Sequence, residues 1–196
     1  EALRESVRAL ADKKIQPFAH DVDANARFPQ EALDALQAAG LAAPHVPVEF
    51  GGQGADALGV VIVIEEVARV CASSSLIPAV NKLGSVPLML GSSESKKERW
   101  LTPLAKGKGF SYCLSESEAG SDAASMKTRA VKNGDGWVLN GSKKWISQGV
   151  DTGAPYAVFL DPLDFPKRKI EIRAIAQNSK GESFVLPVTR LTMSSS

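Results

Sequence analysis

A short stretch of small and hydroxyl-bearing residues in the middle of the chain has the residue types best suited to binding a ligand. It reads FSYCLSESEAGSD, and its apolar start predicts a strand that ends at Leu114. In the loop that follows, Ser115, Ala119, Gly120 and Ser121 leave backbone N–H groups and hydroxyls free to face a ligand. Concave arrays of such groups suit anionic or carbonyl-rich ligands. On these residues alone, the alternative is a Ser/Gly turn with no ligand.

The composition does not support several other kinds of site. Cys71 and Cys113 lie 42 positions apart and His20 and His45 are isolated, so the sequence predicts no metal site, which would need three or four clustered ligands. The net charge of +1 argues against a nucleic-acid partner. The longest apolar run is too short to span a bilayer, so we expect no membrane insertion. Free cysteines without a secretory signal favour a cytoplasmic protein.

The elements that must position the loop change character near residue 108. Before it, apolar residues recur at helical spacing between charges, and Pro17 should kink or end the first helix. Residues 60–64 are β-branched and favour a strand, but the length of the surrounding segment favours a buried helix. Glycines at 51, 52 and 54 mark a loop. Helices are predicted over residues 3–18, 28–40, 57–71, 75–90 and 95–104.

Beyond residue 108 the pattern becomes short and strand-like, with a strong hairpin turn at Asn133–Gly136. The candidate strands are Phe110–Leu114, Met126–Val131, Gly136–Leu139, Lys143–Ser147, Tyr156–Leu160 and 169–175, the last with a return partner at 184–186. Helices followed by strands predict an α+β fold, in which an N-terminal helical bundle precedes a mainly antiparallel β domain. We place the two domains at residues 1–107 and 108–196.

Several separate motifs, in the right order, resemble the acyl-CoA dehydrogenase family. Residues 115–122 (SESEAGSD) look like Thr-Glu-Pro-x-Ala-Gly-Ser-Asp, and residues 140–147 (NGSKKWIS) look like Asn-Gly-x-Lys-x-Trp-Ile-Thr. Residues 47–54 (PVEFGGQG) look like Pro-x-x-x-Gly-Gly-x-Gly. Further fits are found at Glu65–Arg69 and Ala79–Asn81. The resemblance covers about residues 1–149, and the rest of the chain diverges.

The resemblance implies FAD as the cofactor and a fatty acyl thioester as its neighbour. It places the flavin contacts on Tyr112, Cys113, Leu114 and Ser115 and on Trp145, Ile146 and Ser147. Main-chain groups of the first stretch and the two serine hydroxyls would bond the ring, and Trp145 would offer it a flat surface. Ser121 matches a serine that meets both the FAD pyrophosphate and the thioester, and Gly120 would allow close backbone approach. For Trp145 alone, the alternative is an ordinary core residue.

Three departures from the family pattern affect these stretches. Serine replaces threonine at Ser115 and Ser147, which keeps the hydroxyl but removes the methyl that stiffens the side chain. Ser117 replaces proline, so the turn is less rigid. Gln148 replaces asparagine. None of these changes removes a predicted flavin contact.

By resemblance, the activity is α,β-dehydrogenation of acyl-CoA, with electron-transfer flavoprotein as electron acceptor and homo-oligomers among full-length relatives. No residue maps to the catalytic base, because in the family the C-terminal helical domain carries it. We therefore expect this chain to be a truncated form that is inactive alone. Glu116 and Asp122 in the loop are expected to be structural. The alternatives are a non-catalytic module with an incomplete flavin site and a flavin-dependent oxidase or monooxygenase. The acyl chain length is not predicted.

Overall fold

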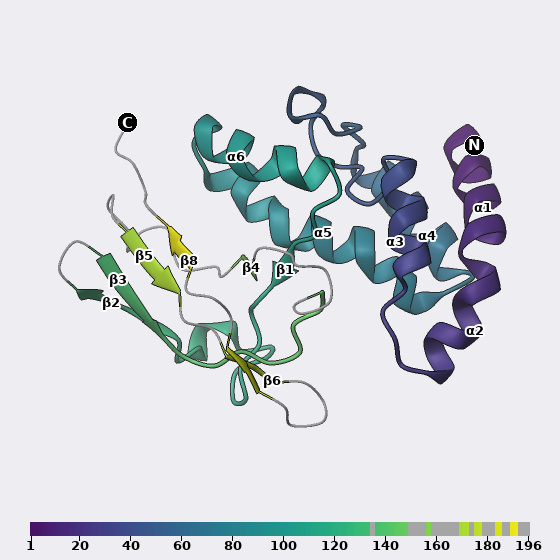
Figure 1. Ribbon diagram of the computed structural model, residues 1–196. Helices are drawn as coiled ribbons and strands as arrows, with labels where there is room; N and C mark the ends of the chain where they lie inside the picture. Colours follow the sequence, from purple (N-terminus) through teal and green to yellow (C-terminus); the bar gives the residue numbers. More distant parts are fainter. Residues whose placement is uncertain are drawn as a thin grey trace. The chain divides into compact units, whose positions relative to one another are not determined.

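The computed structural model divides the chain into two compact units (Figure 1). The helical unit consists of Glu1–Tyr112 with Ser147–Ala157, and the β unit consists of Cys113–Ile146 with Val158–Ser196. The structure describes residues 1–133, 136–148, 156–157, 169–172, 175–177, 183–185 and 189–191.

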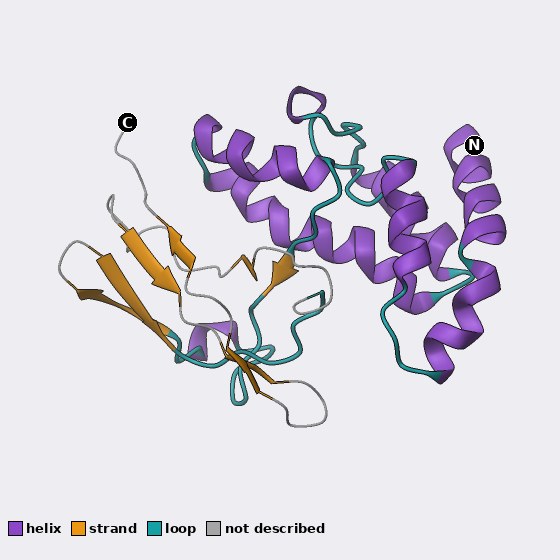
Figure 2. Cartoon of the chain, viewed as in Figure 1, coloured by secondary structure: helices purple, strands orange, loops and turns teal. Residues whose placement is uncertain are grey.

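Helices make up nearly all of the helical unit's regular structure (Figure 2). They are α1 (Ala2–Lys14), α2 (Gln16–Ala24), α3 (Gln30–Ala38), α4 (Ala57–Ala68), α5 (Ala72–Gly91) and α6 (Glu94–Ala105), with a short 3-10 helix η1 (Val48–Phe50). Each predicted helix is confirmed, with ends that differ from the prediction by a few residues. The predicted first helix is two helices, because α1 ends at Lys14 and Pro17 lies in the first turn of α2, where its missing N–H costs nothing.

The β-branched run at 60–64 is helical, as its length suggested. The helix α4 begins after Asp56, whose carboxylate accepts a hydrogen bond from the Gly59 N–H at 2.7 Å and so caps the helix. Its buried face carries Val60, Val63 and Val67, which are at most 1% exposed. Burying each such side chain contributes about 1.5–3 kcal/mol, more than the small helix penalty of a β-branched residue.

Two apolar clusters form the core of the helical unit. The first joins α1, α3 and α4 through side chains such as Val7, Leu36 and Val63, and all three are fully buried. The second joins α6 to the loop that follows α3, through Leu101, Leu104 and Val46. Since each cluster joins segments far apart in sequence, the helices hold one another in place and do not depend on their own propensity.

A buried carboxylate ties α1 to α4 in addition to this apolar contact. Glu66 is 1% exposed and accepts hydrogen bonds from Arg8 Nε at 2.8 Å and Arg4 Nη1 at 2.6 Å, with Arg69 Nε 3.4 Å away. The hydrogen bonds from Arg8 and then Arg4 lower the pKa of Glu66 to about 2, against the opposing effect of burial. The carboxylate therefore stays ionised, and its charge is paired.

The glycine-rich loop at 44–56 is fastened to α5 by buried polar groups. Ser85 Oγ donates to the Asn81 carbonyl at 2.7 Å, so His45 Nε2, 2.6 Å from the same hydroxyl, carries the proton and donates it to Ser85. Asn81 also donates from Nδ2 to the Ala42 carbonyl at 2.8 Å. Gly52 allows the tight path of the loop, because a Cβ there would lie 2.0 Å from the Val46 carbonyl oxygen.

The β unit contains a four-stranded sheet in the order β2-β3-β5-β8. Its strands are β2 (Arg129–Asn133), β3 (Gly136–Asn140), β5 (Lys169–Ile172) and β8 (Thr189–Leu191). β2 and β3 pair antiparallel with Asn133 opposite Gly136, which confirms the predicted hairpin, and the turn residues 134–135 lie outside the described residues. β5 pairs parallel with β3 and antiparallel with β8.

Smaller pairings complete the strands. β6 (Ile175–Gln177) and β7 (Ser183–Val185) pair antiparallel, so the predicted strand at 169–175 is divided between β5 and β6, and the predicted return strand pairs with β6. In the helical unit, β1 (Ser111–Tyr112) pairs parallel with β4 (Tyr156–Ala157). The α+β fold class, helices first and a mainly antiparallel β region second, is confirmed. The exact boundary between domains stays a prediction.

The expectation of a strand at Lys143–Ser147 is wrong. Residues 141–148 form no strand, and Trp145 and Gln148 have positive φ angles of 55° and 61°. Left-handed backbone is incompatible with a pleated strand.

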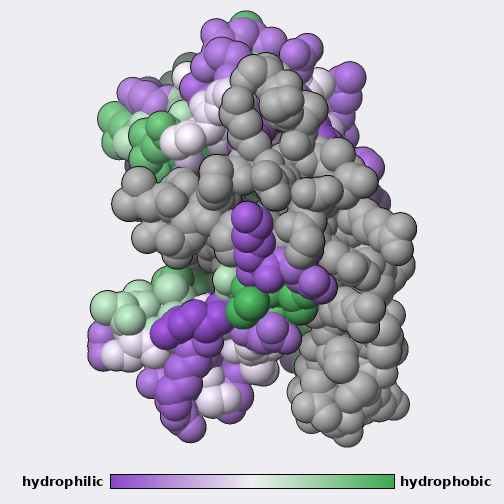
Figure 3. Space-filling view, turned by 90° about the vertical axis from the view of Figure 1, so that its left-hand side faces the viewer, coloured by the Kyte–Doolittle hydropathy of each residue, from purple (hydrophilic) through white to green (hydrophobic). Residues whose placement is uncertain are grey.

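The surface is mixed in character. In Figure 3 the coloured part of the face shown is mostly hydrophilic, with smaller hydrophobic patches. The strand β2 exposes the charged side chains of Arg129 and Lys132 and the apolar side chain of Val131.

We predict that His45 makes the free energy of unfolding rise with pH between about 4 and 6.5. Burial, and then Lys82, lowers the pKa of His45 from 6.5 to about 4 in the folded chain, so the unfolded chain binds more protons across this interval. The contribution of neutral His45 to the free energy of unfolding is complete above pH 6.5. It falls by about 3 kcal/mol in all as the pH decreases through this interval.

Urea unfolding at several pH values measures this effect, with His45→Asn as the matched variant. Asparagine keeps an N–H for Ser85 but does not titrate, so the pH dependence of unfolding should be shallower in the variant. Equal pH dependence in the two proteins would contradict the role given to His45.

Candidate functional site

The predicted binding loop begins directly after β1 and is closed by a backbone turn. The Glu116 N–H donates to the Ala119 carbonyl at 2.8 Å, and Ala119 is buried under the turn. Gly120 and Ser121 follow on the exposed side, and a Cβ built on Gly120 would meet nothing within 4 Å. The loop therefore presents exposed residues at Gly120 and Ser121, with open space where a side chain would lie at residue 120.

The carboxylate of Glu116 is the centre of the contacts that hold this loop. It accepts hydrogen bonds from the backbone N–H groups of Lys127 at 2.7 Å and Thr128 at 3.0 Å, from Thr128 Oγ1 at 2.5 Å and from Lys143 Nζ at 2.8 Å. The hydrogen bond from Lys143, followed by that from Thr128, lowers the pKa of Glu116 to about 2. Glu116 is an ionised structural anchor, as the sequence analysis expected.

Lys143 brings two of the predicted flavin-binding stretches together within the β unit. Its ammonium donates to the Leu114 carbonyl at 3.0 Å as well as to Glu116, and lies 3.3 Å from Met126 Sδ. The next residue repeats the connection, since the Lys144 N–H donates to the Ser115 carbonyl at 2.8 Å. The chain leading to Trp145 is therefore fastened along the end of the first stretch.

Trp145 is presented outward on a constrained backbone. Its side chain is 84% exposed, its φ is 55°, and Lys144 Nζ lies 6.0 Å from the centre of its ring. A bulky residue in the left-handed region is a genuine outlier and marks a position that surrounding contacts impose. Because the Trp145 side chain is exposed, it is not an ordinary core tryptophan, and that alternative is excluded. Ile146 beside it is half-buried.

The remaining predicted residues differ in what they can contribute. Cys113 is buried, and burial raises the pKa of its thiol to about 11, so it offers main-chain groups and a neutral side chain. Tyr112 and Ser147 are half-buried and belong to the helical unit. The predicted set is thus divided between the two units, and the contacts of Lys143 and Lys144 connect members that belong to the β unit.

Two residues of this site were not identified from the sequence. Thr128 supplies two of the four donors to Glu116, and Lys143 supplies the cationic one. Lys143 lay inside a recognised motif, but its partner is 27 positions away. The signal that could have linked Glu116 to Lys143 is chemical, because a buried carboxylate needs a cation as its partner.

Metal chemistry has no support in the part of the chain that the structure describes. No group of three His, Cys, Asp or Glu side chains is close enough there to hold an ion, and both cysteines are free. Asp122 accepts a hydrogen bond from Ser125 Oγ at 2.5 Å, and Glu118 pairs with Lys127 at 2.6 Å. These acidic side chains serve the loop itself.

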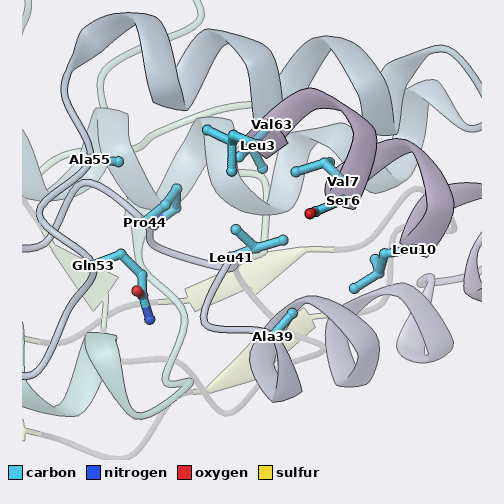
Figure 4. Close-up of a pocket in the computed structure, with 10 residues that line it drawn as sticks. All are labelled: Leu3, Ser6, Val7, Leu10, Ala39, Leu41, Pro44, Gln53, Ala55 and Val63. Carbon is cyan, nitrogen blue, oxygen red and sulfur yellow. The ribbon is translucent and has the colours of Figure 1, made fainter. Parts of the chain in front are cut away.

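A separate pocket of about 330 Å³ lies in the helical unit (Figure 4). Apolar side chains dominate its lining, and they come from α1, from the chain after α3 and from α4: Leu3, Val7, Leu10, Leu41 and Val63. Ser6 and Gln53 are the polar contributions shown with them. Its lining has no titratable group, so the pocket can offer apolar contact but no acid–base chemistry.

None of the described helices is long and apolar enough to cross a membrane.

Comparison with known proteins covers nearly the whole chain. Residues 1–108 match the N-terminal domain of acyl-CoA dehydrogenases, and residues 111–193 match the middle domain. The chain belongs to the acyl-CoA dehydrogenase family. The predicted resemblance is therefore confirmed, and it extends beyond residue 149, where the sequence analysis had placed its end.

Similar acyl-CoA dehydrogenases come from distant organisms. The chain is 62% identical over 148 residues to the probable acyl-CoA dehydrogenase fadE25 of Mycobacterium leprae, a match that covers 75% of this chain and 38% of the relative. It is 38% identical over 154 residues to the mitochondrial short-chain specific acyl-CoA dehydrogenase of Mus musculus, with coverage of 78% and 37%. The chain thus spans about two fifths of the length of these relatives.

Solved structures agree with the fold. Butyryl-CoA dehydrogenase from Megasphaera elsdenii matches 95% of this chain and 48% of its own, with a TM-score of 0.68 and 28% identity. A chain in the structure of the electron transferring flavoprotein of Acidaminococcus fermentans matches 94% of this chain and 46% of its own, with a TM-score of 0.72 and 26% identity. An acyl-CoA dehydrogenase from Geobacillus kaustophilus, 24% identical with a TM-score of 0.70, matches in fold.

We predict that Gly141→Ala destabilises the β unit of this acyl-CoA dehydrogenase chain. A Cβ at residue 141 would lie 2.3 Å from Thr128 Oγ1 and 2.7 Å from Thr128 Cβ, so Thr128 must move and release Glu116. The expected loss is about 1–3 kcal/mol, the usual cost of an unsatisfied buried group.

Thermal unfolding followed by circular dichroism measures the loss. The matched variant is Gly120→Ala, where the new methyl meets open space and the unfolding midpoint should not change. An unchanged midpoint for Gly141→Ala would mean that Thr128 is not needed to hold the loop.

Proposed function

We propose that this chain holds FAD and a fatty acyl thioester as part of an acyl-CoA dehydrogenase. The observation that carries the proposal is the fastening of the segment before Trp145 to the end of the Tyr112–Ser115 stretch, with the indole exposed on an outlier backbone. Family membership supports the proposal, because the similar proteins from Mycobacterium leprae and Mus musculus are named as acyl-CoA dehydrogenases. A bound FAD would supply the acceptor for the hydride that leaves the β-carbon of the thioester.

The residues present fit such a cofactor. Main-chain groups of Tyr112, Cys113 and Leu114 and the hydroxyl of Ser115 would bond the polar edge of the flavin ring. The exposed indole of Trp145 would cover one of its surfaces, flanked by Ile146 and by the hydroxyl of Ser147. The open space at Gly120 leaves room for a pyrophosphate, and the exposed Ser121 would bond both it and the thioester.

The acidic residues of the loop are not proposed as the base for the α-proton. Glu116 is held ionised by four donors and has a pKa near 2, far from the value that suits proton transfer at neutral pH. Glu118 is exposed and paired with Lys127, and Asp122 accepts from Ser125. These three side chains fix the shape of the loop, and the base remains unassigned.

The proposal extends to partners by the same resemblance. Acyl-CoA is the proposed substrate, and electron-transfer flavoprotein is the proposed acceptor of the electrons. Full-length relatives are proposed to be homo-oligomers, and the location is proposed to be cytoplasmic. The incomplete, non-catalytic module remains the second candidate, favoured by the engagement of Glu116, Glu118 and Asp122 in contacts within the loop region.

Flavin spectroscopy separates these readings. A purified chain that retains visible flavin absorption supports an FAD site, whereas a folded chain that does not bind added FAD supports the non-catalytic module. Among FAD-binding outcomes, the dehydrogenase proposal requires that the flavin of the full-length enzyme be bleached by an acyl-CoA. An oxidase or monooxygenase would not be bleached by acyl-CoA, and its flavin would react with oxygen only after reduction by another electron donor.

We predict that Trp145→Ala weakens FAD binding by about 2- to 10-fold. Aromatic stacking is worth about 0.5–1.5 kcal/mol beyond area burial, and the exposed indole has no core contacts whose loss would unfold the chain. Titration of flavin fluorescence measures the affinity. Trp145→Phe should restore part of it, and Val131→Ala, another exposed apolar position, should have no effect. Unchanged affinity in Trp145→Ala would remove the indole from the proposed site.

We also predict that acyl-CoA does not reduce FAD bound to the 196-residue chain at an enzyme-like rate. The loop carboxylates are already engaged, and a positioned base typically contributes about a hundred- to ten-thousand-fold. Anaerobic mixing with a panel of acyl-CoAs, followed by flavin absorbance, tests this expectation. Rapid bleaching by any of them would contradict the prediction and show that a base is present, and Glu118→Gln would test whether the exposed Glu118 supplies it.

A further inference from the structure

The ion pair of Glu116 and Lys143 is nearly removed from solvent and is connected to backbone on both sides. The Glu116 and Lys143 side chains are 8% and 13% exposed, and their charged atoms are 2.8 Å apart. Glu116 also receives two backbone N–H groups, from Lys127 and Thr128, and Lys143 also donates to the Leu114 carbonyl. A buried pair with such additional hydrogen bonds holds its elements in one arrangement.

We propose that Glu116 and Lys143 are positioning residues for the flavin, which fix the segment carrying Trp145 against Leu114 and Ser115 in the loop that follows β1. The proposal rests on the FAD site of the proposed function and assigns the pair a role toward it. Neither side chain needs to touch the cofactor. The pair acts through the Leu114 carbonyl on one side and through the chain direction at Lys144 on the other.

The backbone at Trp145 explains why such a clamp is needed. Its positive φ of 55° is unfavourable for a bulky residue and persists only where neighbouring contacts impose it. Two contacts act immediately before it, from Lys143 Nζ to Leu114 and from the Lys144 N–H to Ser115. Without the first contact, the segment can relax toward ordinary backbone, and the exposed indole would leave its present direction.

The pair has a fixed polarity, which distinguishes it from a simple charge attraction. The acidic side faces backbone N–H donors of Lys127 and Thr128, and the basic side faces the carbonyl of Leu114. Exchanging the two charges would place an ammonium against N–H groups and a carboxylate against a carbonyl oxygen. We therefore expect that a charge-reversed pair cannot replace the original one.

The same loop provides a matched control. Lys127 and Glu118 form an ion pair of 2.6 Å between side chains that are 75% and 73% exposed. Exposed pairs of this kind contribute little. Lys127→Met removes that pair but keeps the Lys127 N–H that Glu116 needs, so it should leave FAD binding unchanged.

The test measures the affinity for FAD and the visible circular dichroism of bound FAD in the 196-residue chain. Lys143→Met should weaken binding about tenfold or more, because Glu116 loses its cation and Leu114 its donor. At saturating FAD, the dichroism of the flavin band should also change, which reports an altered ring environment that a loss of affinity alone would not produce. Lys143→Arg should recover part of both signals.

Two further variants make the outcome decisive. Glu116→Lys combined with Lys143→Glu should not recover binding, and recovery would overturn the fixed polarity and with it the positioning role. If Lys143→Met does not fold, Thr128→Val removes one hydrogen bond to Glu116 with little change of shape and should weaken binding about 2- to 10-fold. Full affinity and an unchanged flavin dichroism in folded Lys143→Met or Thr128→Val would overturn the proposal.

The behaviour of the unaltered chain separates the two levels of inference. If it binds FAD and the variants bind equally well, only the positioning role is overturned and the proposed function stands. If the folded, unaltered chain does not bind FAD at all, the proposed function fails and the positioning role fails with it.

Discussion

A charge removed from water must be compensated, and in the β unit that requirement falls on the carboxylate of Glu116. Four donors meet it, two from backbone N–H groups and two from the side chains of Thr128 and Lys143. Three of these donors come from the adjacent residues Lys127 and Thr128, just before β2, and the fourth comes from Lys143, in the segment before Trp145. Because an unpaired buried charge is so costly, these parts cannot move independently without a loss of stability.

The helical unit applies the same rule with a different residue. Glu66 is buried between α1 and α4 and is paired with Arg4 and Arg8, which lie 62 and 58 positions away in the sequence. Apolar packing brings α1 and α4 together. The pairing of Glu66 with both arginines favours one alignment of the two helices over others that apolar packing alone would allow. In both units, therefore, a buried and ionised carboxylate joins segments that are far apart in the sequence.

Local patterns were sufficient to predict most of the fold. Helical spacing and length identified the helices, including α4 with its β-branched run, and the Asn-Gly-Asp-Gly sequence identified the β2–β3 hairpin. The prediction for segment 143–147 failed because Trp145 and Ile146 are residue types that favour strands, while the backbone of the segment is set by contacts of Lys143 with Glu116 and Leu114, 27 and 29 positions earlier. Periodicity contains no information about such distant partners.

The candidate site shows the same division. Motif resemblance identified the correct family, and it predicted two stretches that the structure joins through Lys143 and Lys144, while the flavin contacts assigned to them stay predictions. Thr128 remained unnoticed because a threonine at a strand start has no distinctive pattern, and its value comes only from the carboxylate it meets. The placement of Tyr112 and Ser147 in one unit and of the other residues in the second likewise depends on chain packing that no single motif encodes.

Cys113 shows what burial does to a reactive atom. With a thiol pKa of about 11, only about one side chain in ten thousand is a thiolate at neutral pH. Thiolates, and not thiols, attack disulfides and are oxidised by peroxide. The chain directly after β1 can therefore carry a sulfur atom next to the proposed flavin site without becoming a target for oxidants or electrophiles.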